Sequence, residues 1–242
     1  MKIEALFISD VHLGSRGCNS NELLTTLKQY EPKYLIIVGD FVDGWLLKRR
    51  YFWRPDYTEI IKTILSYSQN GTKVVYVTGN HDDFFREYTP ILFGGNIRIV
   101  NEYIWNDFFI THGDLYDGVV KLKWLGKLGG FGYEVAIWLD RILKSFGYRK
   151  SLSKWLKKTV KDAVKFITDF EKQLAYQAKQ RGCSGVIAGH IHTPTDRIVK
   201  IGDDEIRYLN CGDWIENNSY IIYDSDRFTI KYYDSTFDKK VK

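Results

Sequence analysis

The chain has 242 residues, of which 44% are hydrophobic and 27% charged, and a formal net charge of +5. This composition is typical of a folded globular protein and excludes a disordered one. It contains no run of 18 uncharged apolar residues and only three unpatterned cysteines, so we expect neither a membrane-spanning helix nor a disulfide framework. The N-terminus lacks the layout of a signal peptide, and we expect a protein of the reducing cytoplasm.

The first third of the chain predicts a β-α-β-α-β unit. Residues 3–9, 34–39 and 73–79 are short runs rich in Ile, Val, Tyr and Phe, which is typical of buried strands. Between them, residues 22–30 and 57–69 have the apolar spacing of helices. This alternation favours a parallel sheet with right-handed crossovers.

Further strands are predicted in the second half of the chain. Residues 108–111, 185–189 and 206–210 are apolar runs of strand length. Residues 220–223 and 228–232 flank Asp224-Ser225-Asp226, which predicts a closing hairpin.

Residues 116–181 differ from the rest of the chain and predict an inserted helical cap. Two series of apolar residues with helical spacing, at 124–146 and 152–178, follow each other, and a cluster of glycines interrupts the first. The segment holds 15 basic and 6 acidic residues, a local net charge of +9, so the remainder is net negative. We therefore divide the chain into a core, residues 1–115 and 182–242, and a basic cap.

All five histidines lie in short motifs that directly follow predicted strands. Because ligand sites gather at the carboxyl ends of parallel strands, we expect these loops to converge on one edge of the sheet. Carboxylate, imidazole and amide groups without sulfur favour Mn²⁺, Fe²⁺ or Zn²⁺ over Ca²⁺ or a structural zinc site. The motifs are Ser9-Asp10-Val11-His12, Gly39-Asp40-Phe41-Val42-Asp43, Gly79-Asn80-His81-Asp82, Thr111-His112-Gly113-Asp114 and Gly189-His190-Ile191-His192.

Several of these residues have a simpler interpretation. A single histidine is more often a hydrogen-bonded polar group than a ligand, but five in such motifs favour metal binding. Asp82 and Asp114 are interpreted as loop, cap or turn residues. Asp213 either positions a motif loop or only caps one.

The five motifs, in this order, resemble those of the calcineurin-like metallophosphoesterases. The resemblance implies an α/β fold of four layers, a two-sheet β-sandwich flanked by helices, with the helical cap inserted. It implies that Asp10, His12, Asp40 and His192 hold one metal ion, and that Asp40, Asn80, His112 and His190 hold a second. His81 would be the catalytic histidine and Asp43 its orienting partner. The implied reaction is two-metal hydrolysis of a phosphoester or phosphoanhydride.

Within that superfamily the chain resembles the branch of UDP-2,3-diacylglucosamine diphosphatases. The resemblance is carried by residues 39–45, by the helical insertion and by Asn210-Cys211-Gly212-Asp213-Trp214. It implies a Mn²⁺-dependent enzyme of lipid A synthesis that releases UMP and holds acyl chains under its cap. The best-known enzymes of the branch carry arginine where this chain has His81, which leaves the exact substrate open.

The basic cap allows more than one ligand. Its apolar stripe is explained by internal helix packing, and its lysines by a solvated face. A functional interpretation favours an anionic, lipid-linked substrate and contact with the cytoplasmic face of the inner membrane. A broad phosphodiesterase or nuclease is the alternative, and a non-catalytic module on the same fold the third hypothesis. The candidate substrate-binding residues are Lys121, Lys157, Lys158, Lys161 and Lys165.

Overall fold

The computed structural model describes residues 1–117 and 152–234, without the side chains of 152–163. By compactness the chain divides into one unit of residues 1–114 and 174–242, and a second of residues 115–173. The predicted boundaries of the cap stay a prediction. In the described part, no helix is both long enough and apolar enough to cross a membrane.

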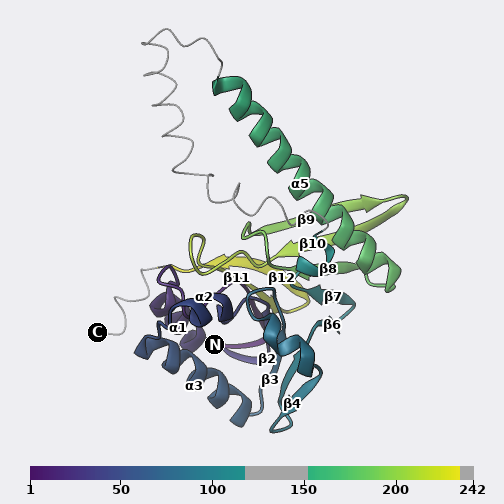
Figure 1. The fold of residues 1–242 in the computed structure, drawn as a ribbon. Helices are drawn as coiled ribbons and strands as arrows, with labels where there is room; N and C mark the ends of the chain where they lie inside the picture. Colours follow the sequence, from purple (N-terminus) through teal and green to yellow (C-terminus); the bar gives the residue numbers. More distant parts are fainter. Residues whose placement is uncertain (118–151, 235–242) are drawn as a thin grey trace, which may run out of the picture. The chain divides into compact units, whose positions relative to one another are not determined.

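Seven strands form the first sheet, in the order β12-β11-β1-β2-β3-β5-β4 (Figure 1). Strands β1, β2, β3 and β5 are parallel, whereas β11, β12 and β4 are antiparallel to their neighbours. The predicted strands and closing hairpin of this sheet are confirmed, with β1 at Lys2–Ile8, β2 at Glu31–Val38, β3 at Lys73–Val77, β11 at Ser219–Asp224 and β12 at Arg227–Tyr232. Two further strands, β4 at Ile91–Phe93 and β5 at Ile97–Val100, were not predicted.

Two helices cover the outer face of this sheet (Figure 1). Leu6 and Ile8 of β1 point toward them, and the alternate residues Ala5 and Phe7 point to the opposite face, as the two-residue period of a strand requires. Helices α1 (Ser20–Gln29) and α3 (Pro55–Gln69) contribute the buried side chains Leu23, Leu27, Tyr57, Ile60 and Ile64.

Five strands form a second sheet, in the order β6-β7-β8-β10-β9. Strands β7, β8 and β10 are parallel, and β6 and β9 are antiparallel edges. The inner faces of the two sheets share one hydrophobic core, in which Phe7 packs edge-to-face on Trp105 at 5.5 Å between ring centroids. The strands are β6 at Glu102–Trp105, β7 at Phe108–Thr111, β8 at Gly185–Ala188, β9 at Thr195–Ile201 and β10 at Asp204–Asn210.

The remaining described helices are α2 (Gly44–Arg49), α5 (Leu152–Gln180) and two 3₁₀ turns, η1 (Asp83–Tyr88) and η2 (Asp114–Tyr116). α5 confirms the second predicted helical series as one continuous helix, and the first series lies outside the described residues. After α5, Arg181 contacts Glu102 at 3.0 Å and lies over the Phe109 ring. The chain is thus an α/β protein with two mixed sheets and flanking helices, as predicted.

Candidate metal centre

Five loops bring the motif residues together, and they come from both sheets. Asp10, Asp40 and Asn80 follow β1, β2 and β3 of the first sheet, whereas His112 and His190 follow β7 and β8 of the second. The prediction that all five loops leave one sheet edge was therefore wrong. The parallel strands of the two sheets end on the same side of the shared core, so their loops still meet.

The backbone is unusual at the motif residues. A positive φ is rare for residues other than glycine, and such positions cluster at functional sites. Here the backbone bonds within the loops hold it in place, with His12 N donating to Asp40 O at 2.9 Å and Asp10 N to Gly39 O at 3.1 Å. Five motif residues have φ between 50° and 72°, namely Asp10, His12, Asp40, His190 and His192.

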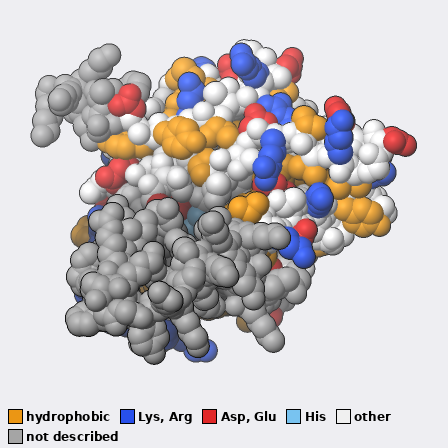
Figure 2. All heavy atoms as spheres, turned by 90° about the horizontal axis from the view of Figure 1, so that it is seen from above, with side chains coloured by type: hydrophobic (Ala, Val, Ile, Leu, Met, Phe, Trp, Pro, Cys, Tyr) orange, Lys and Arg blue, Asp and Glu red, His pale blue; other side chains and the backbone are white. Residues whose placement is uncertain are grey.

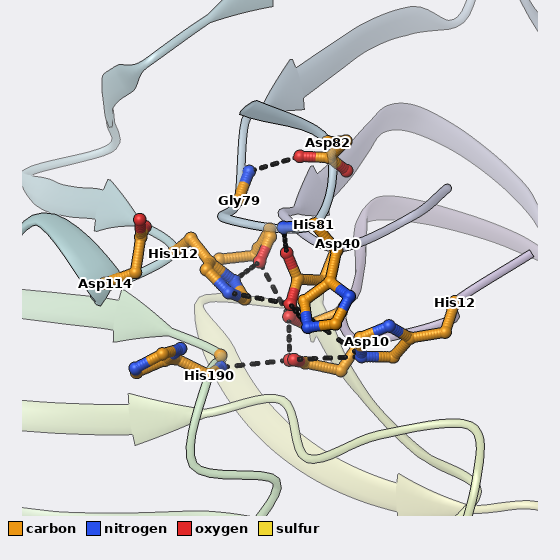
Figure 3. A network of polar contacts seen from close by, with 12 residues as sticks. Asp10, His12, Asp40, Gly79, His81, Asp82, His112, Asp114 and His190 are labelled. Carbon is orange, nitrogen blue, oxygen red and sulfur yellow. Dashed lines mark hydrogen bonds and ion pairs between the residues drawn. The ribbon is translucent and has the colours of Figure 1, made fainter. Parts of the chain in front are cut away.

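The side chains of Asp10 and Asp40 lie at the centre of the cluster (Figure 3). Asp10 Oδ1 lies 3.0 Å from His192 Nε2, and Asp40 Oδ2 lies 3.3 Å from His112 Nε2. Asp40 Oδ2 is also 3.8 Å from His12 Nε2, so this carboxylate faces one histidine of each predicted metal site. Three sets of ligand atoms within 4.8 Å of one another result among the described residues: Asp10 with His12 and His192, Asp10 with Asp40 and His112, and His12 with Asp43 and His81.

Among the buried polar atoms that make no hydrogen bond within the described part of the chain, four belong to the residues that the motifs predict as ligands. They are Asp10 Oδ1, His12 Nε2, Asn80 Oδ1 and His112 Nε2. Buried polar groups are normally hydrogen-bonded, because leaving one without a partner costs about 1–3 kcal/mol. All four belong to the predicted ligand set, and their nitrogen and oxygen donors fit a divalent transition-metal ion.

Two of the imidazoles, those of His112 and His192, are oriented by an oxygen atom that contacts their Nδ1. His112 Nδ1 lies 2.9 Å from the Val38 carbonyl oxygen, to which it donates, and His192 Nδ1 lies 3.0 Å from Asp213 Oδ2. In both rings Nε2 is thereby turned toward the carboxylates, the arrangement usual for metal-binding histidines. Asp213 thus both positions a motif residue, His192, and caps its own loop, because its Oδ1 also accepts from the backbone N–H groups of Glu216 and Asn217.

The pKa shifts show how strongly the carboxylates and the imidazoles of the site interact. Burial alone would raise the pKa of Asp10, but His192 and His112 outweigh it and hold the pKa at about 2. Burial likewise acts against the positive charge of His112, yet Asp40 and Asp10 raise its pKa to about 10. The buried carboxylates therefore require a positive charge beside them, which a bound cation supplies when the imidazoles are neutral ligands.

His81 is held on three sides. Its Nδ1 lies 3.1 Å from Asp43 Oδ1, the contact predicted for the orienting carboxylate. Its ring lies 4.4 Å from the Trp45 ring and packs edge-on against His12 at 4.6 Å. Its Nε2 is left facing the cluster, 4.0 Å from Asp40 Oδ2.

Sequence reasoning undervalued Asp82 and Asp114. Asp82 is fully buried and accepts from Gly79 N at 2.5 Å, from Phe41 N at 2.8 Å and from the Tyr76 hydroxyl, so it fixes the loop that carries Asn80 and His81. Asp114 forms a two-pronged ion pair with Arg86.

Arg86 connects loops of the two sheets. Its guanidinium also donates to the Thr78 carbonyl at 3.2 Å, at the end of β3, while Asp114 follows β7. The charge pattern of the sequence held no signal for this pair, because 28 residues separate its members.

The remaining predicted site residues are not placed among the candidate ligand groups of the described part of the chain. His190 contributes its backbone N–H to Asp10 Oδ2 at 3.0 Å, and its ring centroid lies 5.2 Å from that of His112, but it is in none of the three candidate ligand groups of the described residues. Lys165 is exposed on α5. Lys121 and the side chains of Lys157, Lys158 and Lys161 lie outside the described residues.

Comparison with known proteins confirms the resemblance predicted from the motifs. A model of the family described as calcineurin-like phosphoesterase matches residues 3–194. A UDP-2,3-diacylglucosamine hydrolase of Porphyromonas gingivalis is 24% identical over 268 residues, covering 96% of this chain and 98% of that protein. One of the same name from Aeromonas hydrophila is 22% identical and covers 91% and 94%. Yfce, a phosphoesterase from E. coli, aligns with a TM-score of 0.47 and 17% identity, over 96% of this chain and 94% of that one.

Proposed function

The chain belongs to the calcineurin-like phosphoesterase family, and we propose that it hydrolyses the phosphoanhydride of a lipid-linked nucleotide sugar, UDP-2,3-diacylglucosamine, to the lipid 1-phosphate and UMP. That it is a metal-dependent phosphoesterase follows from the family. The choice of substrate is supported by curated relatives of that name that align over nearly their whole length. The observation that carries the chemistry is the convergence of buried, unbonded ligand atoms around Asp10 and Asp40.

In this proposal the metal ligands are those implied by the motifs. Asp10, His12, Asp40 and His192 hold one ion, and Asp40, Asn80, His112 and His190 hold the other, with Asp40 shared. The ions, which we propose to be Mn²⁺ with Fe²⁺ or Zn²⁺ as substitutes, supply Lewis acidity to the phosphate oxygens and acidify a water molecule. The position of Asp40 Oδ2, within 3.8 Å of His12 Nε2 and within 3.3 Å of His112 Nε2, supports the shared role.

His81 serves the leaving group. In hydrolysis the water oxygen forms a bond to phosphorus, the anhydride P–O bond breaks, and the departing phosphate takes a proton or a stabilising charge. Asp43 holds His81 Nδ1, so Nε2 is the atom that donates. The 24% exposure of the His81 side chain leaves this atom accessible to a substrate.

The lipid-linked substrate would be met at the cytoplasmic face of the inner membrane. Lys121, Lys157, Lys158, Lys161 and Lys165 remain the proposed substrate-binding residues of the cap. Removing the charges at 157, 158, 161 and 165 is expected to raise KM for the lipid substrate and to spare a small chromogenic diester. Equal losses on both substrates would indicate misfolding instead.

A phosphodiesterase or nuclease remains the second candidate, because residues 116–181 carry a strong basic excess. A nucleic-acid backbone needs a continuous basic surface. On the part of the face that Figure 2 colours by type, the described lysine and arginine side chains lie among acidic and hydrophobic ones and do not form a continuous basic surface.

One experiment separates the two candidates. The protein is incubated with Mn²⁺ and UDP-2,3-diacylglucosamine, and in parallel with bis-p-nitrophenyl phosphate, and UMP release is followed by mass spectrometry. Fast UMP release with slow diester cleavage is the expected result. Diester cleavage without UMP release would retain the metal chemistry and refute the lipid substrate.

A further inference from the structure

We propose that helix α2 and the turn after it, residues 44–51, form a docking surface for an anionic lipid bilayer. The segment combines exposed apolar side chains with exposed basic ones, and it begins at the residues that hold His81. This α2 surface is separate from the predicted cap and consists of described residues.

The apolar part of the α2 surface is formed by Leu46 and Tyr51, together with the exposed portion of Trp45, whose ring also contacts His81. Leu47 faces Gly14, since a Cβ on Gly14 would lie only 2.8 Å from its Cγ. Trp45 and Leu46 are 43% and 39% exposed, and Tyr51 is 77% exposed. Large apolar side chains at such positions on a short surface helix are typical of elements that enter the interfacial layer of a membrane.

The basic part adjoins it. Lys48, Arg49 and Arg50 are exposed and form no ion pair with the described residues. Because residues three and four apart share a helix face, Lys48 and Arg49 lie beside Trp45 and Leu46.

No acidic residue occurs between Gly44 and Pro55 in the sequence. The next basic residue, Arg54, is instead paired with Asp56 at 2.6 Å. Three unpaired positive charges beside apolar side chains match a surface of acidic lipid headgroups. They match a nucleic acid less well, because an aliphatic side chain such as Leu46 neither stacks on bases nor binds phosphate.

The α2 surface is fixed to the candidate active site. Asp43, which contacts His81, also caps α2 by accepting from Leu46 N at 2.9 Å. Gly44 N donates to the His81 carbonyl at 2.9 Å, and the Trp45 ring lies 4.4 Å from the imidazole. A bilayer that contacts α2 therefore lies next to the loop that carries the catalytic histidine. The inference rests on the proposed function only in that the substrate is presented by a membrane.

Co-sedimentation with vesicles tests the α2 surface without turnover. The vesicles are phosphatidylcholine with or without one quarter phosphatidylglycerol, and the test variant is K48Q/R49Q/R50Q. Each basic residue near an anionic surface strengthens binding by about fivefold, so the variant is expected to bind anionic vesicles on the order of 100-fold more weakly. A second variant, Tyr51→Ser, is expected to weaken binding while keeping all charges.

A control variant with the same loss of charge is K28Q/R227Q/K231Q, at exposed positions outside the α2 surface. It is expected to bind vesicles nearly as the unmodified protein does. Equal vesicle binding by the unmodified protein and the two triple variants, or equal losses of binding in the two triple variants, would overturn the proposal. Loss of duplex or single-stranded DNA binding in K48Q/R49Q/R50Q with vesicle binding intact would overturn it in favour of nucleic acid. Cleavage of bis-p-nitrophenyl phosphate and UMP release, measured on the same proteins, report on the proposed function separately.

Discussion

Gly189, between β8 and His190, is the position where one methyl group is expected to abolish most of the activity. A Cβ there would overlap Ser9 Oγ and lie 2.5 Å from Asp10 Oδ2, whereas ordinary contacts of a Cβ begin at 3.4 Å. Asp10 cannot yield freely, because its Oδ2 accepts from Ser9 Oγ at 2.5 Å and from His190 N at 3.0 Å. Gly189→Ala must therefore displace the Asp10 carboxylate by about 1 Å or separate the two loops.

The two consequences differ in size. Overpacking of this kind costs about 1–3 kcal/mol of stability, which a folded domain tolerates. A displacement of about 1 Å in a ligand costs about 100-fold in rate. We therefore expect a folded protein whose Mn²⁺-dependent cleavage of bis-p-nitrophenyl phosphate falls about 100-fold and whose Mn²⁺ affinity is weakened.

Urea unfolding, Mn²⁺ titration calorimetry and the diester assay measure the three quantities. Gly17→Ala is the matched control, since a Cβ at Gly17 would lie 3.4 Å from Ile215 Cγ2, an ordinary contact. It is expected to behave as the unmodified protein. Unchanged activity and Mn²⁺ affinity in Gly189→Ala would refute the reasoning, because the glycine would then not be needed for the approach of the two loops.

Three other predictions concern the same site. Asp40→Asn is expected to lose both metal ions and all activity, because Asp40 Oδ2 faces both His12 and His112, one histidine of each proposed metal site; bound Mn²⁺ measured at two ions per chain would contradict this. Arg86→Gln and Asp114→Asn should each cost about 2 kcal/mol in urea unfolding, between exposed and buried ion pairs, since the two side chains are 21% and 11% exposed. The double variant should cost clearly less than the sum, and strict additivity would show that the pair does not interact. Removal of metal with EDTA should lower Tm by roughly 5–10 °C, reversibly on adding Mn²⁺ at about 100 times its Kd, and an unchanged Tm would show that the folded protein has no metal site.

The sequence was most informative where strands are buried on both faces. Strands β1, β2 and β3 are nearly continuous apolar runs, so their ends, and therefore the positions of Asp10, Asp40 and Asn80, could be predicted. The sequence analysis did not anticipate β4, β5, β6 and β9. The first three are three or four residues long, and β9 is mostly exposed at the edge of its sheet. Such strands form because a neighbour offers hydrogen bonds, which no local pattern reveals.

The residues that support the site were harder to predict than the proposed ligands. Asp82 appeared to be a loop carboxylate because its partners, Tyr76, Phe41 and Gly79, are not adjacent to it in the chain. Serine before Asp10 carried no signal either, although Ser9 Oγ lies within hydrogen-bonding distance of both Asp10 Oδ2, at 2.5 Å, and the Val38 carbonyl oxygen, at 2.6 Å. Ligand types recur in motifs because the metal demands them, whereas supporting contacts depend on how the loops pack.

The backbone of the motif loops indicates that the fold builds the metal centre rather than the reverse. A residue in the left-handed region costs about 1–2 kcal/mol, so the five motif residues there together cost on the order of 5–10 kcal/mol. Backbone bonds between loops, such as His12 N to Asp40 O and Trp214 N to Asp10 O, and the core between the two sheets hold these conformations. Since those contacts involve no ligand atom, the loops are expected to keep their shape without metal. A preformed site of this kind selects ions by donor type and spacing, which explains why Mn²⁺, Fe²⁺ and Zn²⁺ all remain compatible with it.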